Sequence, residues 1–209
     1  MNFDRETLDS LREAVRTRIS EKRYIHTLGV EKMAIALGSV LLPERLDELS
    51  AAAILHDVAK ELTFDEHLAL LKGSDVPYTQ DDILSRPALH SIAAVPLIMS
   101  EFSEFATPDI LSAVANHTLG APGMSVFDEI IFISDYAEEG RTYPVCIEVH
   151  DFLLNKLDNN RSYEENVDAL HLASLKATVS TVDSLTRRNE IINPKTLDTK
   201  KYLESLNLG

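Results

Sequence analysis

Cysteine is almost absent from this chain of 209 residues, in which Cys146 stands alone. A single cysteine excludes an intramolecular disulfide and any metal cluster held by several thiolates. We therefore interpret Cys146 as a small buried apolar residue, and we expect the protein to work in a reducing compartment.

Basic residues are also scarce: 20 Lys and Arg stand against 34 Asp and Glu, for a formal net charge of -14. Such a chain is not attracted non-specifically to nucleic acid or to anionic membranes. A small polyanionic ligand could bind only where a metal ion, a lysine or an arginine compensates the charge locally.

Long apolar runs are missing too, because no segment reaches the roughly 18 apolar residues that a membrane span requires. The amino terminus is charged and lacks the apolar core of a signal peptide. We therefore expect a cytoplasmic protein without a membrane partner. With 44% hydrophobic residues, the length suits one domain over residues 1–209, and no linker divides it. A homodimer is left open.

The alternation that marks β-strands is nearly absent, whereas a period of 3.6 residues recurs throughout. The sequence predicts an all-α protein. Its expected helices are a pair within 5–38, then segments at about 46–61, from Pro87, from Thr107 to His117, from Ser125, at about 145–157, at about 163–188, and after Asn193.

Several helix boundaries follow from local chemistry. Thr63-x-x-Glu66 and Ser162-x-x-Glu165 are capping boxes, and Ser125 opens a helix in the same way. Pro96 should kink or end its segment, because proline lacks the backbone donor. His67, on the short helix after Thr63, is expected to be solvated.

Four histidines lie beside or within apolar runs, each on or at the end of a different expected helix. They are His26, His56, His90 and His117. A lone inward histidine is usually a hydrogen-bonded core residue. Here, however, Asp57 and Asp135 also have apolar surroundings, where an unpaired charge is unfavourable and a bound cation would neutralise it. The set predicts a metal site between helices.

The chain contains its own comparison for the His56-Asp57 dipeptide, because His150-Asp151 repeats it. No face of small residues precedes His150, and acidic neighbours flank it. We assign His150 to a helix surface or core edge, and we interpret His171 as structural.

Imidazoles and carboxylates without thiolates suit iron, manganese, zinc, cobalt or nickel, whereas calcium and magnesium prefer shells of oxygen. The residues do not choose among these transition metals. Such an ion can activate water and polarise a phosphoryl oxygen, as hydrolysis of a phosphate ester or anhydride requires.

These residues resemble the HD-domain phosphohydrolases, and within them the bacterial YqeK-type symmetrical diadenosine tetraphosphatases. The resemblance runs from about residue 17 to 205, with an HD core at about 17–145 and scaffold helices at about 146–205. The motifs are Arg23-Tyr-x-His26, His56-Asp57-x-Ala-Lys60, His90-Ser, Asn116-His117-Thr118-x-Gly120-x-Pro-x-Met124, Asp135-Tyr-x-Glu138-x-x-Arg141 and Asn193-Pro-x-Thr-Leu.

The resemblance implies an enzyme that cuts diadenosine tetraphosphate symmetrically into two ADP, with one or two divalent ions, iron first. It implies metal ligation by His26, His56, Asp57 and Asp135, and by Asp57, His90 and His117 for a second ion. It implies catalytic roles for Asp57, Lys60, His90 and His117. The substrate-binding residues it implies are Arg23, Lys60, His90, His117, Thr118, Glu138 and Arg141. For Glu138, orientation of a ligand or of Arg141 is the alternative.

The chain departs from that branch at four positions, with Leu119, Ala121, Asp128 and Glu139 where Thr, Arg, Lys and Pro are common. Ala121 removes a basic side chain and weakens the expected hold on a phosphate or base. Two alternatives stay open: an HD hydrolase of another nucleotide, such as a nucleoside monophosphate or an alarmone, and a nucleotide-binding regulator with little turnover.

Overall fold

The computed structural model describes residues 3–206, which form eleven α-helices and no β-strand. The helices are α1 (Arg5–Arg16), α2 (Glu21–Leu41), α3 (Leu46–Leu55), α4 (Phe64–Lys72), α5 (Gln80–Leu84), α6 (Leu89–Glu101), α7 (Pro108–Asn116), α8 (Val126–Ala137), α9 (Pro144–Lys156), α10 (Tyr163–Arg187) and α11 (Pro194–Ser205). The all-α prediction is confirmed for this part of the chain. None of these helices is long and apolar enough to cross a membrane. The ends of the predicted domain, residues 1–2 and 207–209, lie outside the described range.

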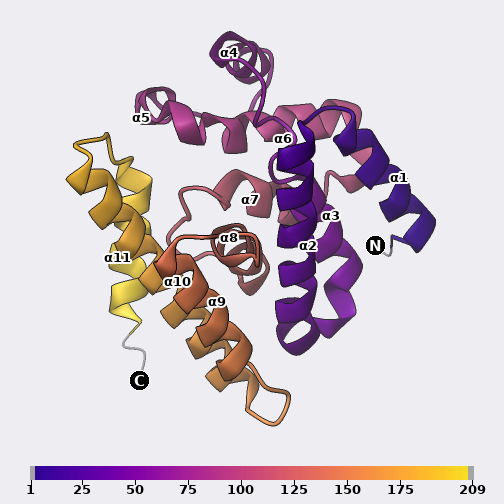
Figure 1. The fold of residues 1–209 in the computed structure, drawn as a ribbon. Helices are drawn as coiled ribbons and strands as arrows, with labels where there is room; N and C mark the ends of the chain where they lie inside the picture. Colours follow the sequence, from indigo (N-terminus) through magenta and orange to yellow (C-terminus); the bar gives the residue numbers. More distant parts are fainter. Residues whose placement is uncertain (1–2, 207–209) are drawn as a thin grey trace.

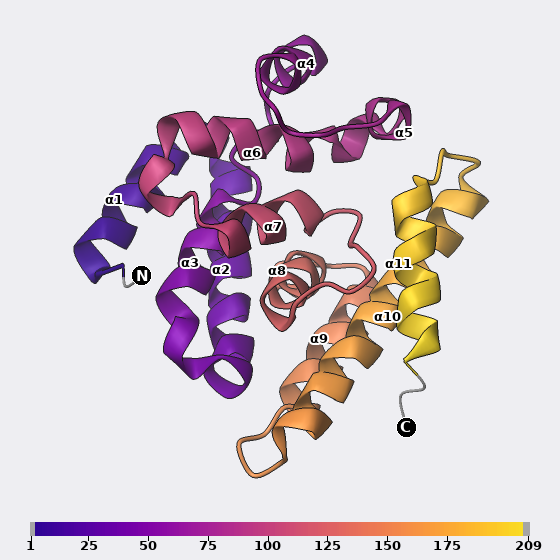
Figure 2. The same cartoon turned by 180° about the vertical axis from the view of Figure 1, so that it is seen from behind.

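The centre of the bundle is α8, which packs against α2, α3, α7, α9 and α10. Both ribbon views show α8 between the N-terminal helices α2 and α3 and the C-terminal helices α9 and α10 (Figure 1, Figure 2). Phe127, Ile130, Ile131 and Ile133 are at most 2% exposed. A helix that is apolar on several sides must be covered on several sides. Asp135, one turn beyond Ile131, is thereby carried into the bundle.

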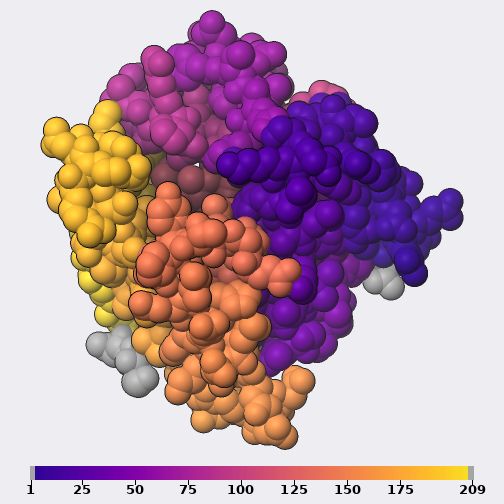
Figure 3. Space-filling view, viewed as in Figure 1, coloured from indigo at the N-terminus to yellow at the C-terminus, as the bar shows by residue number. Residues whose placement is uncertain are grey.

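The N-terminal helices α2 and α3 approach each other closely. Ala51, Ala52 and Ala53 on α3 are fully buried, and a side chain at Gly38 on α2 would collide with Leu49. In the space-filling view, a recess opens where these indigo and purple helices meet the magenta, orange and yellow parts of the chain (Figure 3). Surfaces from distant parts of the sequence therefore meet around one hollow.

The helix predicted to reach residue 61 ends earlier, at Leu55. In a continuing helix the N–H of Asp57 would bond to the carbonyl of Ala53. That carbonyl instead lies 2.6 Å from Nδ1 of His56. The chain beyond follows short turns such as Lys60 N–H to Asp57 O, at 2.9 Å. The prediction was wrong here because a buried side chain competes with the backbone for the last carbonyls of the helix.

Pro96 does not end its helix, because α6 continues through it to Glu101. Val95, Pro96, Leu97 and Ile98 are all buried. A proline inside a helix costs about 3 kcal/mol or more, and burial of a single Leu or Ile side chain contributes about 1.5–3 kcal/mol. Packing on both sides of Pro96 therefore maintains the helix.

His67 is buried, not solvated as expected: it is 6% exposed. Its Nε2 lies 2.8 Å from the carbonyl oxygen of Ala59, in the turn after α3. The capping box at Thr63 is confirmed, as are those at Ser125 and Ser162. Sequence located the start of α4, whereas the contact of His67 depends on how α4 packs.

A partly buried ion pair joins α8 to α10: His171 Nδ1 lies 2.8 Å from Oε2 of the buried Glu129. The hydrogen bond to Glu129 raises the pKa of His171 above its ordinary value. Stabilisation by the charged pair should be complete below about pH 6.5 and should disappear as the pH rises through the raised pKa. We expect His171→Gln to lower the free energy of unfolding by about 2 kcal/mol at pH 6, and by less at pH 9.

Denaturant unfolding of the wild type and of His171→Gln at several pH values measures the difference between their free energies of unfolding. The titration of all other groups is common to both proteins and cancels in this difference. A difference that stays constant or grows between pH 6 and pH 9 would contradict the assignment of a charged His171–Glu129 pair.

Candidate metal centre

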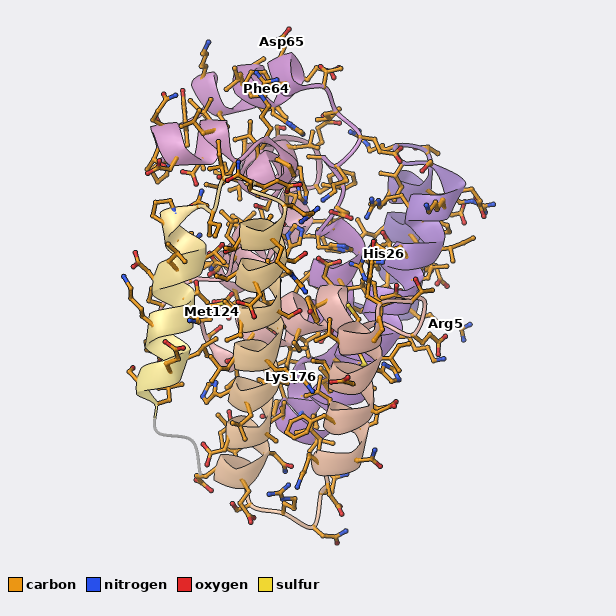
Figure 4. All side chains as sticks on the ribbon, turned by 60° about the vertical axis from the view of Figure 1, so that its left-hand side comes forward. Arg5, His26, Phe64, Asp65, Met124 and Lys176 are labelled. Atoms are coloured by element: carbon orange, nitrogen blue, oxygen red, sulfur yellow. The ribbon has the colours of Figure 1, made fainter. Side chains whose placement is uncertain are left out.

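The six residues predicted from sequence to bind metal come together inside the bundle, although they lie on five separate segments. His26 comes from α2, His90 from α6 and Asp135 from α8, while His56 with Asp57 and His117 directly follow α3 and α7. Figure 4 shows His26 between α2 and the C-terminal helices. The predicted grouping is therefore a real cluster in space.

Asp57 lies between two groups of histidines. Its Oδ2 is 3.4 Å from Nε2 of His56 and 3.9 Å from Nε2 of His26. Its Oδ1 is 3.1 Å from Nε2 of His90 and 3.6 Å from Nε2 of His117. The Asp57 carboxylate thus directs one oxygen to His26 and His56, the first half of the cluster. It directs the other oxygen to His90 and His117, the second half.

Asp135 completes the first half. Its Oδ1 lies 2.9 Å from Nε2 of His26 and 3.9 Å from Nε2 of His56. One potential ligand atom from each of His26, His56 and Asp135 lies within 4.8 Å of the other two, and the same holds for His56, Asp57 and His117. These distances are short enough for one ion to contact the members of either group.

Three of the imidazoles are oriented by backbone carbonyls three residues earlier. Nδ1 lies 2.6 Å from Ala53 O in His56, 2.7 Å from Val114 O in His117 and 3.0 Å from Pro87 O in His90. A carbonyl can only accept, so each Nδ1 carries the proton and each Nε2 presents a lone pair to the cluster. For His56 and His117, the carbonyls are free because α3 and α7 end there.

His26 differs because it lies inside α2, where the nearby carbonyls are used by the helix. Its Nδ1 instead lies 3.2 Å from Oε1 of Glu138, which follows α8. The side chain of Glu138 is 6% exposed. Two roles were predicted for Glu138, contact with substrate and orientation of a ligand or of Arg141; the side chain lies behind His26 and 3.8 Å from Arg141 Nε.

Both aspartates are held in their charged form. Burial by itself would raise the pKa of Asp57, but the surrounding histidines, His56 first, lower it well below its ordinary value. Burial likewise opposes the lowered pKa of Asp135, which results from the hydrogen bond with His26 and from the charge of Arg141. Arg141 Nη2 lies 2.6 Å from Asp135 Oδ1, and Arg23 Nη1 lies 2.8 Å from Asp57 Oδ2.

Lys60 and Thr118 lie beside the second half of the cluster. Lys60 Nζ is 3.1 Å from His90 Nε2 and 3.8 Å from Asp57 Oδ1, and burial lowers the pKa of Lys60. Thr118 Oγ1 is 3.0 Å from His117 Nε2. Burial also lowers the pKa of His90, to about 3. The side chains of Arg23, Lys60 and Arg141 remain about 30% exposed, so three cations border the cluster.

This donor set fits a divalent transition-metal ion. Among the described residues, His56 Nε2 and Asp57 Oδ1 are buried and have no hydrogen-bond partner. In addition, the Nε2 atoms of His90 and His117 lie 3.1 Å apart, although both present lone pairs. Converging acceptors repel one another unless a cation or proton lies among them, and unpaired buried polar atoms are destabilising. Imidazole and carboxylate are ligands suited to iron, manganese, cobalt, nickel or zinc.

The loop after His117 is held by the C-terminal helix, through residues that sequence reasoning did not single out. Lys195 Nζ lies 2.8 Å from Asn116 Oδ1. Thr199 Oγ1 lies 3.3 Å from Leu119 O and 2.8 Å from Lys195 O, so its one proton is shared between these carbonyls. Gly120 has φ of +67°, and a side chain there would meet Thr199. The motif beginning at Asn193 was the sequence signal for this contact, because α11, which makes it, starts directly after Asn193.

Two of the departures from the family pattern have structural explanations. The Asp128 side chain accepts the backbone N–H of Ser125 in the capping box that begins α8. Glu139 pairs with Lys32 at 2.7 Å on the surface. Neither the second dipeptide nor His171 joins the cluster, since His150 Nδ1 lies 2.7 Å from Ala137 O and His171 pairs with Glu129. The structural interpretation of His150 and His171 is confirmed.

Comparison with known proteins agrees with the geometry. Residues 23–141 match the HD domain family. The chain is 30% identical over 193 residues to a symmetrical bis(5'-nucleosyl)-tetraphosphatase of Halalkalibacterium halodurans, covering 91% of this chain and 94% of that protein. It is 30% identical over 192 residues to the protein of the same name from Bacillus subtilis, with the same coverage.

A crystal structure from Clostridium acetobutylicum, described as a predicted HD superfamily hydrolase involved in NAD metabolism, matches with a TM-score of 0.81 and 25% identity. The match covers 95% of this chain and 97% of that one. Together, the His and Asp cluster, the family match and the nearly full-length relatives show that this chain belongs to the HD-domain family, among the proteins named symmetrical bis(5'-nucleosyl)-tetraphosphatases.

Proposed function

We propose that this protein is a metal-dependent hydrolase that cleaves diadenosine tetraphosphate with one water molecule into two ADP. The observation that carries the proposal is the cluster around Asp57, in which buried hydrogen-bond acceptors without partners converge. The chain is also similar to two proteins named for that activity, over 94% of the length of each. We propose that the whole chain forms one HD-type unit, since its core runs from Leu8 on α1 to Ala177 on α10.

We assign the first ion to His26, His56, Asp57 and Asp135, and a second ion, when bound, to Asp57, His90 and His117. Iron is the proposed native metal. The bound metal would activate water and polarise a phosphoryl oxygen, two roles that such ions supply in hydrolysis. His56, His90 and His117 hold their Nε2 lone pairs ready for this, because Nδ1 of each donates to a backbone carbonyl. Nδ1 of His26 faces the carboxylate of Glu138.

Charge balance supports a polyphosphate substrate. Three carboxylates, Asp57, Asp135 and Glu138, lie beside three cations, Arg23, Lys60 and Arg141. Each bound divalent ion would add two positive charges to this balanced site, within a chain of net charge -14. The local excess would attract the phosphate chain while the rest of the surface repels other polyanions.

The cations at the rim define how the substrate would be held. Lys60 would contact an oxygen of the scissile anhydride, and Arg23 and Arg141 would contact neighbouring phosphates. Thr118 would donate through its hydroxyl. His90 and His117, together with Asp57 and Lys60, would border the phosphorus that reacts. Glu138 would act on substrate binding only through His26, since its Oε1 lies 3.2 Å from His26 Nδ1.

The test is product analysis of purified, metal-quantified protein with diadenosine tetraphosphate under Fe, Mn, Co, Zn and Mg. We expect ADP as the sole product, with the oxygen of isotopically labelled water in half of the ADP formed. Nucleoside monophosphates, guanosine alarmones and NAD should be turned over at least 100-fold more slowly, an estimate based on rejection by a site whose polar groups are left unpaired.

Two outcomes would replace the proposal. Faster hydrolysis of another nucleotide would make the protein an HD hydrolase with a different substrate. Bound metal and tight ADP binding without product under any metal would indicate a nucleotide-binding regulator.

A further inference from the structure

We propose that Glu138 is a positioning residue that fixes the tautomer and orientation of His26, so that Nε2 of His26 is available to the metal. This inference rests on the proposed function in one respect, the assignment of His26 as a metal ligand. It assigns Glu138 to the support of a ligand instead of direct contact with substrate.

The need for such a residue follows from where His26 lies. His56 and His117 end their helices and find free carbonyls there, and His90 begins its helix next to the carbonyl of Pro87. His26 is the sixth residue of the 21-residue helix α2, where carbonyls of the preceding turn accept helix hydrogen bonds. Nδ1 of His26 therefore requires an acceptor from another element.

Glu138 supplies that acceptor with both of its oxygens engaged. Oε1 lies 3.2 Å from His26 Nδ1, and Oε2 accepts the backbone N–H of Gly140 at 2.5 Å. Arg141 Nε lies 3.8 Å from Oε1. Because an ionised carboxylate only accepts, Glu138 holds a proton on Nδ1 of His26. Nε2 of His26 faces Asp135 Oδ1 at 2.9 Å, and a cation bound by these two residues would take the Nε2 lone pair. A carboxylate bonded to the distal nitrogen in this way makes a histidine a better metal ligand.

Two glycines leave the space that this carboxylate fills. A Cβ at Gly29, one turn after His26 on α2, would collide with Oε2 of Glu138 and lie 3.1 Å from Cδ. A Cβ at Gly140 would lie 2.9 Å from Oε2 and 3.0 Å from Oε1. Glycine at both positions therefore leaves the volume that the Glu138 carboxylate occupies next to His26.

Two variants test the inference by independent routes. Glu138→Gln keeps the shape but has only one oxygen, so it can accept from His26 or from Gly140 but not from both. Gly29→Ala keeps every proposed ligand and displaces the end of the Glu138 side chain. Alanine is also favoured over glycine within a helix by about 1 kcal/mol, so this variant should fold.

Co(II) binding to the metal-free proteins, followed by visible absorption in competition with a chelator, is the measurement. We expect both variants to raise the Kd for Co(II) by roughly 10–100-fold. Histidine nitrogen NMR of the metal-free wild type should show a proton on Nδ1 of His26, and both variants should populate the tautomer in which only Nε2, which faces Asp135, carries the proton.

The matched control is Glu139→Gln, because Glu139 is the exposed neighbour of Glu138 and pairs with Lys32; its Co(II) affinity should equal that of wild type. His26→Ala separates the two proposals. Wild-type affinity in Glu138→Gln and Gly29→Ala, with affinity lost in His26→Ala, would overturn the positioning role alone. Unchanged affinity in His26→Ala would overturn the ligand assignment and the positioning role with it.

Discussion

Asp57→Asn should reduce kcat/KM for diadenosine tetraphosphate by roughly three orders of magnitude, about 4 kcal/mol of transition-state stabilisation, and should lower the bound metal. The carboxylate of Asp57 faces His26 and His56 through one oxygen and His90 and His117 through the other. Asparagine preserves the shape but removes the charge and puts a donor where one oxygen stood. Both halves of the cluster should therefore lose affinity for a cation.

Steady-state kinetics and metal analysis measure this effect, with denaturant unfolding to establish that the variant folds. The chain offers a matched control in Asp151→Asn, which alters the second His-Asp dipeptide at an exposed position. That control should keep wild-type activity and metal content. Retention of activity by Asp57→Asn would remove the central residue from the proposed mechanism.

Lys60→Met should keep the bound metal and lower kcat/KM by roughly 100-fold, as expected for loss of one charged group that stabilises the transition state. Methionine retains much of the apolar stem, so the loss is that of the ammonium next to His90 and Asp57. An effect mainly on kcat would mean that Lys60 interacts more strongly with the transition state than with the bound substrate, whereas an effect on KM alone would indicate uniform binding.

The control for Lys60→Met is Lys32→Met, since Lys32 is an exposed lysine paired with Glu139. We expect no change in its kinetics. Lys60→Arg should recover only part of the activity, because guanidinium is larger and planar and does not replace a compact ammonium. Unchanged kinetics in Lys60→Met would make Lys60 an ordinary lysine near the site.

The cluster of histidines and aspartates could be predicted because these polar residues occur in apolar stretches of the sequence. Histidines and aspartates beside alanines and isoleucines, as at His56-Asp57 and Asp135, are unfavourable in a core unless something compensates them. The dipeptide alone was not sufficient, as His150-Asp151 demonstrates. What distinguished His56 was the buried face of small residues before it, which the structure confirms for Ala52 and Ala53.

Predictions were less successful where a side chain competes with the backbone or packs on a distant segment. The end of α3 was placed at residue 61, whereas the His56 imidazole takes the carbonyl of Ala53 and the helix stops at Leu55. His67 was expected in solvent, whereas the carbonyl of Ala59 binds it beneath α4. Neither contact has a signature in hydrophobic periodicity.

The helical class and the capped starts of α4, α8 and α10 follow from residue type and from spacing along one helix. The six residues of the cluster could be recognised because each is a polar residue in an apolar stretch. The packing of distant helices, in contrast, sets which histidines each oxygen of Asp57 faces and which acceptor holds His26. His26 and Glu138 are 112 positions apart, and no local rule links residues at that separation. Their contact exists because α2 packs on α8 and because Gly29 leaves the room for it.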